Sequence, residues 1–292
     1  MTDATQGIDG AIVIDKPVGP TSASVMRRVE RRLGATKAGH AGTLDPLASG
    51  VLLILLGEGT KLSSLLMEHD KVYEATLTLG RATDTLDAQG QVTAEAPVPP
   101  LDLATVERAL ARFVGAFDQI PPVYSAIKKD GRSLMSRARA GESDIPTEPR
   151  RVVCHAARVL DLEPLRVEVH VGKGFYVRSL ARDLAAALGP VGHLAALRRT
   201  RLGAFEVERA VAPDDATPAG VIPLAAMVPG LEVVRLGPAD VGHLRAGRPV
   251  ELGAGPDELM ALDEAGQAIA WIRRDPGAGL GVYRVQRGFV GR

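Results

Sequence analysis

The chain has 292 residues, a formal net charge of zero and 46% hydrophobic residues, which is typical of a soluble globular protein. This length suffices for one large domain and a small one. The balanced charge argues against a nonspecific binder of polyanions. The single cysteine, Cys154, excludes an internal disulfide framework and a cysteine-based zinc site. Because the sequence shows no membrane-span-length apolar run and no signal pattern, we expect a cytoplasmic protein with no membrane partner.

The N-terminal segment predicts a strand over residues 11–14, followed by a helix. Thr21 or Ser22 can cap this helix, its apolar residues fall on one face, and Gly34 ends it. Basic residues surround the same helix and form two further groups along the chain. The three groups are Arg27, Arg28, Arg31, Arg32 and Lys37; Lys128, Lys129, Arg132, Arg137 and Arg139; and Arg198, Arg199 and Arg201. We interpret them as local patches that suit the binding of a defined RNA shape, with solvated helix faces as the alternative.

An acidic residue stands among small, turn-forming neighbours in the segment His-Ala-Gly-Thr-Leu-Asp-Pro-Leu-Ala-Ser-Gly over residues 40–50. Pro46 disfavours helical geometry at Asp45, and Gly42 and Gly50 permit a ligand to approach the backbone closely. Asp-Pro is also a common turn dipeptide, so a structural role is the alternative. A carboxylate that is exposed and fixed in direction has the properties that a nucleophile or general base needs.

Strands are predicted over residues 51–56, 71–79 and 166–171. The alternation in 71–79 places Tyr73 on the same, inward face as the apolar residues. Asp102 is predicted to cap a helix with a buried stripe of Val106, Leu110 and Phe113 that stops at Gly115. A last helix carries Leu180, Leu184 and Leu188 on one stripe and stops at Gly189.

Two stretches depart from this pattern. Residues 119–150 are basic and punctuated by proline and glycine, with a short helix predicted around 133–140, and an excursion of this length is usually functional. After Pro229-Gly230 the composition changes to short strands separated by glycine-rich turns. We therefore predict a catalytic domain over residues 1–230, with an insertion at about 119–150, and a small β domain over residues 231–292.

The segment around Asp45 closely resembles the catalytic motif of the TruB family of tRNA pseudouridine synthases. Further stretches resemble motifs of the same family in the family's order and spacing: residues 14–22, 71–75, 80–87, 119–128, 172–180 and 197–200. The resemblance covers about residues 8–210. It implies an α/β (α+β) pseudouridine synthase fold, with a central mixed, largely antiparallel sheet and flanking helices. The C-terminal segment resembles, more weakly, the small PUA domain of this family.

The resemblance also assigns roles to residues. It makes Asp45 the nucleophile, Arg178 its ion-pair partner, and Tyr73 the residue that stacks on the uracil and moves the C5 proton. The remaining substrate-binding residues that it implies are His40, which fills the place of the flipped base, Lys16, Leu197, Tyr176, and the insertion residues Lys128, Arg132 and Arg137. The attack falls on uracil C6 or ribose C1′, and both paths are open at this stage.

The implied reaction isomerises uridine 55 in the TΨC loop of tRNA to pseudouridine by base flipping. It includes no redox step, so we expect no cofactor and no metal, and the sequence shows no phosphate-binding loop motif and no metal-ligand spacing. We expect a monomer with tRNA as its partner. One alternative is a carboxylate-dependent hydrolase, which needs a second carboxylate. Asp84 or Asp87 would have to supply it, and both lie in a predicted turn. The others are a non-catalytic tRNA-binding or tRNA-folding protein and a guide-RNA-dependent relative.

Overall fold

The computed structural model describes residues 7–125, 127–129, 132–140, 142 and 147–289. Among them, nine strands form one large sheet: β1 (Gly10–Lys16), β2 (Ala38–His40), β3 (Ala48–Leu56), β4 (Lys71–Leu79), β7 (Gly115–Gln119), β10 (Arg150–Leu162), β11 (Leu165–Val171), β12 (Gly192–Leu202) and β13 (Phe205–Glu206). The main path through this sheet runs β1-β3-β12-β4-β11-β10-β7. Only β3 and β12 pair in parallel among these strands, so the prediction of a mixed, largely antiparallel sheet is confirmed.

The helices are α1 (Ser22–Leu33), α2 (Ser63–Glu68), α3 (Leu103–Ala111), α4 (Leu134–Arg139), α5 (Val177–Leu188) and α6 (Pro238–Arg245). Three of them, α1, α3 and α5, share one apolar core with the large sheet. The predicted caps are confirmed, because the Thr21 side chain accepts from the Ser24 amide and the Asp102 side chain accepts from the Thr105 amide. One detail is wrong: α3 ends at Ala111, and Phe113 lies beyond it, where its ring meets Phe117 edge-on.

Strand β3 has apolar side chains on both faces, and each face packs into a different core. Leu52, Ile54 and Leu56 face the core beneath the helices, whereas Leu53 and Leu55 belong to a second core on the opposite face. A continuous apolar run is the expected signature of a strand buried on both faces. In β4 only one face is buried among apolar neighbours, which explains its strict alternation.

Strand β12 is an element that sequence patterning did not predict. It lies between β3 and β4, and its residues 197–199 pair with residues 48–50 of β3 and with residues 73–75 of β4. The strand contains three arginines and a threonine in a row, and such a polar stretch is typical of a solvated segment rather than of a central strand. The pairing of β12 brings the Asp45 loop, which precedes β3, next to the strand that carries Tyr73.

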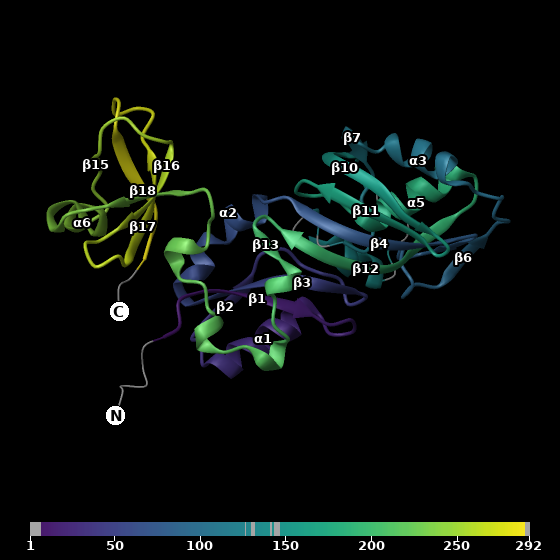
Figure 1. Ribbon diagram of the computed structural model, residues 1–292, viewed down its shortest axis with the longest axis horizontal. Coiled ribbons are helices and arrows are strands. Elements are labelled where there is room, and N and C mark those ends of the chain that lie inside the picture. Colours follow the sequence, from purple (N-terminus) through teal and green to yellow (C-terminus); the bar gives the residue numbers. More distant parts are fainter. Residues whose placement is uncertain (1–6, 126, 130–131, 141, 143–146, 290–292) are drawn as a thin grey trace.

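A second sheet contains β14 (Glu232–Arg235), β15 (Val250–Glu251), β16 (Glu258–Leu262), β17 (Ala268–Arg274) and β18 (Val282–Gly288), with α6 against it. Figure 1 shows this sheet set apart from the large one and joined to it beside α2. The joint is apolar: Met260, Leu262 and Trp271 share a core with Leu62 and Leu66. The boundary at residue 230 and the PUA-like character of this unit stay predictions.

Two short hairpins lie off the large sheet, β5 (Arg81–Thr83) with β6 (Val92–Glu95) and β8 (Lys128–Lys129) with β9 (Arg132–Ser133). The second hairpin and α4 lie in the predicted insertion, part of which falls outside the described residues. The short helix predicted around residues 133–140 is α4. No helix in the part of the chain that the structure describes combines the length and the apolar character of a membrane span.

Gly50 offers a test of the β3–β12 contact. Its φ is +100°, and a Cβ atom there would lie 2.2 Å from the carbonyl oxygen of Arg199. Both overpacking against backbone and the left-handed conformation oppose a side chain, so we expect Gly50→Ala to lower the free energy of unfolding by about 3 kcal/mol. Gly34→Ala is the matched control, since Gly34 also has a positive φ, +65°, but open space around it. Equal losses of stability in the two variants, measured by urea unfolding, would contradict a steric clash at Gly50.

Candidate active site

The candidate active site is a cavity of about 810 Å³ between the large sheet and the start of α5. This volume lies within the roughly 300–1,000 Å³ of small-molecule sites. Segments far apart in the sequence line it: residues 42–45, the start of β4, residues 171–178, and two residues of β12. Asp45, Tyr73, Arg178, Leu197 and Tyr176 all line this cavity, so the structure brings these five predicted residues together.

Asp45 is held in place through its neighbours. Leu44 and Leu47 are buried on either side of it, and the Ser22 hydroxyl donates to the Leu44 carbonyl while accepting from the Leu44 amide, both at 2.8 Å. The Gly19 amide donates to the Pro46 carbonyl. These contacts fix the backbone of the loop, whereas the Asp45 side chain retains 37% of its exposure. The carboxylate is therefore directed and still accessible from the cavity.

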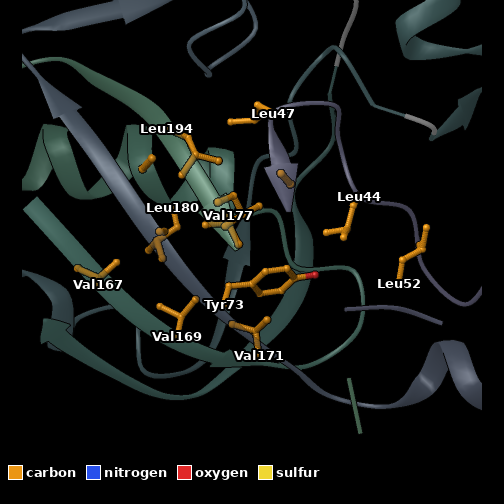
Figure 2. Packing of buried hydrophobic residues seen from close by; sticks show 14 of the residues in the cluster. Leu44, Leu47, Leu52, Tyr73, Val167, Val169, Val171, Val177, Leu180 and Leu194 are labelled. Atoms are coloured by element: carbon orange, nitrogen blue, oxygen red, sulfur yellow. The ribbon is translucent and has the colours of Figure 1, made fainter. Parts of the chain in front are cut away.

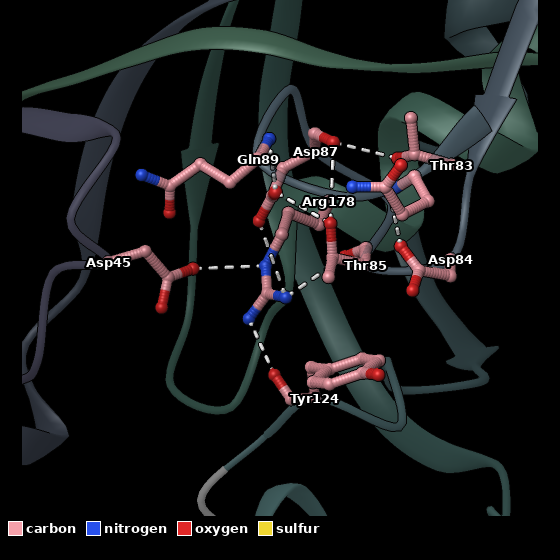
Figure 3. A network of polar contacts seen from close by, with 9 residues as sticks. Asp45, Thr83, Asp84, Thr85, Asp87, Gln89, Tyr124 and Arg178 are labelled. Atoms are coloured by element: carbon pink, nitrogen blue, oxygen red, sulfur yellow. Dashed lines mark hydrogen bonds and ion pairs between the residues drawn. The ribbon is translucent and has the colours of Figure 1, made fainter. Parts of the chain in front are cut away.

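Arg178 is the second residue of α5, and its side chain is only 8% exposed. Its Nε atom lies 2.9 Å from Asp45 Oδ2, its Nη1 donates to the Thr85 carbonyl at 3.1 Å, and its Nη2 donates to the Tyr124 carbonyl at 2.9 Å. Figure 3 shows the guanidinium between these three partners. The planar fork thus fixes the orientation of the group that faces Asp45.

From the sequence, Asp87 is a candidate only as the second carboxylate of a hydrolase, whereas the structure places it beside Arg178. The predicted turn is present, and Leu86 within it has a φ of +62°. The Asp87 side chain is 6% exposed, accepts from the Thr85 hydroxyl and the Gln89 amide, and lies 3.6 Å from Arg178 Nη1. A buried aspartate in a turn has no local sequence signature that separates it from exposed Asp84, so only the fold reveals it.

The electrostatics of Asp45 reflect two opposing influences. Burial raises the pKa of the Asp45 carboxyl above its ordinary value, the Arg178 charge opposes that rise, and the Asp87 charge adds to it. Lys16 also opposes the rise. The site therefore holds a carboxylate that is less stable as the anion than a solvated aspartate, and such a carboxylate is a better proton acceptor and nucleophile.

Lys16 is completely buried, and its Nζ donates to the carbonyls of Pro17 and Pro20, each at 2.8 Å. Burial lowers the pKa of Lys16 to about 8, against the opposing charge of Asp45. Lys16 is absent from the cavity wall, as is His40. The pKa of His40 is lowered by burial and then by the Arg199 charge, which favours the neutral ring. The substrate-binding roles of both residues stay predictions.

Arg199 corrects the interpretation of the third basic patch. Its side chain is buried, with 1% of the residue exposed, and its Nε donates to the Val51 carbonyl at 2.7 Å while Nη2 donates to the Gly42 carbonyl at 3.1 Å. Arg198 forms an ion pair with Asp15 at 2.8 Å. Arg199 thus joins the two ends of the loop that carries Asp45, so including it in a basic surface patch is wrong, whereas Arg198 and Arg201 are part-exposed.

Tyr73 faces the cavity from β4, as its inward alternation predicts. Its ring lies among Val169, Val171 and Val177, with the hydroxyl pointing toward the side of Leu44 (Figure 2). Leu197, 9% exposed, lies on the neighbouring strand. Burial raises the pKa of the Tyr176 phenol, so this group stays neutral. Aromatic and aliphatic walls of this kind suit a flat heterocycle.

Of the insertion, Tyr124, Ser125 and Arg150 line the cavity, whereas Arg132 and Arg137 do not. Arg132 and Arg137 both pair with Glu142, at 3.0 and 2.6 Å. The Lys128 side chain lies outside the described residues. The basic patch around α1 is also partly engaged, because Arg28 pairs with Asp214 and Arg32 Nε donates to the Ala216 carbonyl. The direct RNA contacts expected of Lys128, Arg132 and Arg137 stay predictions.

Known proteins are similar to this chain in sequence. A model of the N-terminal domain of TruB family pseudouridylate synthases matches residues 30–177, and a model of the C-terminal domain of tRNA pseudouridylate synthase B matches residues 178–219. A relative from Aromatoleum aromaticum named tRNA pseudouridine synthase B is 42% identical, over 90% of this chain and 87% of the relative. A relative of the same name from an Azoarcus species is 44% identical, over 82% and 83% of the two chains.

Two solved structures show the same fold at low identity. A chain of an H/ACA ribonucleoprotein bound to a substrate RNA containing 2′-deoxyuridine superposes with a TM-score of 0.70 and 23% identity, over 97% of this chain and 86% of that one. A chain of a Cbf5–Nop10–Gar1 complex superposes with a TM-score of 0.71 and 23% identity, over 99% and 91%. The predicted fold class is thereby confirmed.

The coupling between Asp45 and Asp87 can be measured directly. Because the Asp87 charge raises the pKa of Asp45, we expect Asp87→Asn to lower that pKa, so that the Asp45 anion persists to lower pH. Carboxyl carbon NMR of aspartate-labelled protein, titrated from pH 7 downward, reports the pKa. Asp84→Asn is the control from the same turn and should leave Asp45 unchanged. An Asp45 pKa that is the same with and without the Asp87 charge would contradict the coupling.

Proposed function

The chain belongs to the TruB family of pseudouridylate synthases, and from this membership we propose that Asp45 is the nucleophile with which it isomerises uridine 55 in the TΨC loop of tRNA. The observation that carries the proposal is the Asp45 carboxylate, accessible from a cavity and fixed at 2.9 Å from a buried arginine. The pseudouridine synthase activity itself follows from family membership. The residue roles and the position in tRNA are the part that we propose.

The reaction breaks the bond between uracil N1 and ribose C1′ and forms a bond between C5 and C1′. A proton leaves C5 and N1 gains one, so atoms and electrons balance without an oxidant. Asp45 adds to C6 or to C1′, and in either path it must be ionised. Arg178 supports that ionised form by its charge and holds the carboxylate in direction. The rate therefore falls as the pH drops through the raised pKa of Asp45.

The cavity walls supply the other requirements. The uridine must leave its stack in the tRNA arm, which costs a few kcal/mol, and a flat apolar pocket offsets part of that cost. We assign the stacking contact to Tyr73, whose hydroxyl moves the C5 proton directly or through water, and the opposite contact to Leu197. His40, neutral by its lowered pKa, suits an apolar role in the place that the base vacates better than a role as a phosphate ligand.

We propose that the protein acts on tRNA without a guide RNA or protein partners, as a cytoplasmic monomer. The relatives above 40% identity carry the name tRNA pseudouridine synthase B, whereas the ribonucleoprotein chains match at 23%. The basic insertion around Arg132 and Arg137 would contact phosphates and set affinity and salt dependence. A requirement for a guide RNA or for protein partners would favour the guide-dependent alternative instead.

A tritium-release assay tests the proposal. The purified protein alone is mixed with an unmodified tRNA transcript labelled at uridine C5, and we expect release stoichiometric with tRNA. Asp45→Asn preserves the shape of the side chain but removes the nucleophile, so release should fall by at least about 10⁴-fold while the tRNA dissociation constant changes by less than about twofold.

The substrate offers a matched control in the same experiment. A transcript in which uridine 55 is replaced by cytidine should release no tritium, which locates the reaction. Tight tRNA binding with no release from the wild type would leave a non-catalytic RNA-binding protein. Full release by Asp45→Asn would move the nucleophile to another residue.

A further inference from the structure

We infer that Asp70, His155 and His170 form a binding site for one divalent transition-metal ion such as Zn²⁺ at the rim of the active-site cavity. These residues come from the turn before β4, from β10 and from β11. His155 Nε2 lies 3.2 Å and His170 Nε2 lies 3.5 Å from the same oxygen, Asp70 Oδ2. The three donor atoms all lie within 4.8 Å of one another.

These separations match the requirements of a metal site. Metal–ligand bonds of about 2.0–2.1 Å in a tetrahedral zinc site place neighbouring donor atoms about 3.3 Å apart. Both separations from Asp70 Oδ2 are close to this value. The side chains are 31–45% exposed, so the imidazole rings can rotate to close the remaining gap, and an ion can enter from solvent.

The backbone of β10 is shaped so that the two histidines share one face. In a regular antiparallel pair, His155 and Ala156 would point to opposite faces. The register between β10 and β11 shifts between Cys154 and Ala156, so His155 is the extra residue of a β-bulge beside the Ala156–His170 pair. Bulges re-aim side chains in this way. The two imidazole rings consequently lie with their centroids 4.8 Å apart.

Asp70 and the surrounding backbone are also fixed. The Gly203 amide donates to the Asp70 carbonyl at 2.9 Å, which holds the turn. A Cβ atom on Gly172 would lie 3.8 Å from both Asp70 Oδ1 and His155 Nε2, so this glycine backbone lies against the cluster. Gly172 and Lys71 both line the cavity, which places the cluster at its rim.

The donor set selects the class of ion. Two imidazoles and one carboxylate suit Zn²⁺, Co²⁺, Ni²⁺ or Fe²⁺, whereas Mg²⁺ prefers oxygen ligands. Three protein ligands leave at least one coordination position for water. Among the nearby cations, Lys71 Nζ donates to the Met67 carbonyl and Lys173 pairs with Glu68, whereas Arg201 places a further positive charge near His170. Because the isomerisation needs no metal, we assign this ion no step in the reaction.

Metal uptake by the full chain tests the inference without reference to activity. Calorimetric titration with Zn²⁺ should give a stoichiometry of one, and Co²⁺ should give the absorption bands of a nitrogen- and oxygen-ligated ion. Binding to the folded state alone should also raise the thermal unfolding temperature with metal concentration. Mg²⁺ at the same concentration should produce neither effect.

Variants locate the site. We expect His155→Gln and His170→Gln each to weaken Zn²⁺ binding by at least about tenfold, and the double variant to abolish it. His243→Gln, an exposed histidine of α6, is the matched control and should bind like the wild type. Absence of stoichiometric uptake by the wild type would overturn the inference, as would uptake by the double variant equal to that of the wild type.

Discussion

The Arg178 guanidinium is taken out of water at the point where three separate loops meet, and the geometry of the site depends on that burial. Its donors reach Asp45, the Thr85 carbonyl and the Tyr124 carbonyl, so each loop supplies part of what the buried charge needs. Leaving a buried charge without partners is costly, and of the partners of Arg178 the Asp45 carboxylate, 37% exposed, is the one that stays open to the cavity. The loop of Asp45, the turn of Asp87 and the segment that enters the insertion are therefore stabilised in one mutual arrangement. The arrangement of the active site therefore depends on the partners that the Arg178 guanidinium requires.

The elements that can be predicted from the sequence are those whose signals are local. Strand β4 begins and ends where the alternation of apolar and polar residues indicates, and this alternation places Tyr73 on the inward face. Thr21 and Asp102 cap the helices that follow them. Asp45 stands out in the sequence because Pro46 follows it and Gly42 and Gly50 flank its segment. Its role as nucleophile and the role of Arg178 follow from the resemblance of their segments to motifs of the family. For the strand and the caps, the residues that define the geometry are neighbours in the chain.

Residues whose roles arise from distant pairing are not predictable in this way. Arg199 counts as one more surface charge until β12 is placed between β3 and β4, where its side chain joins the two ends of the Asp45 loop. Asp87 and Asp84 belong to the same turn, and only one of them is buried. Asp70, His155 and His170 lie far apart in the chain, and a bulge in β10 brings the two histidines onto one face. Composition and spacing carry no information on such contacts, because they depend on which strands are neighbours.

The apolar contact between the C-terminal sheet and the large sheet determines whether the two can be separated. Met260, Leu262, Trp271 and Phe289 complete the same core as Ala11, Val13, Leu53 and Leu55, and Lys61 donates to the Gly288 carbonyl across it. The C-terminal sheet is therefore not an independent domain on a flexible linker. Cutting the chain after residue 230 would expose an apolar surface on each fragment. Removing the unit without loss of stability would require polar substitutions at the residues of β1, β3 and α2 that it covers. The C-terminal sheet thus contributes to the stability of the first strands of the chain.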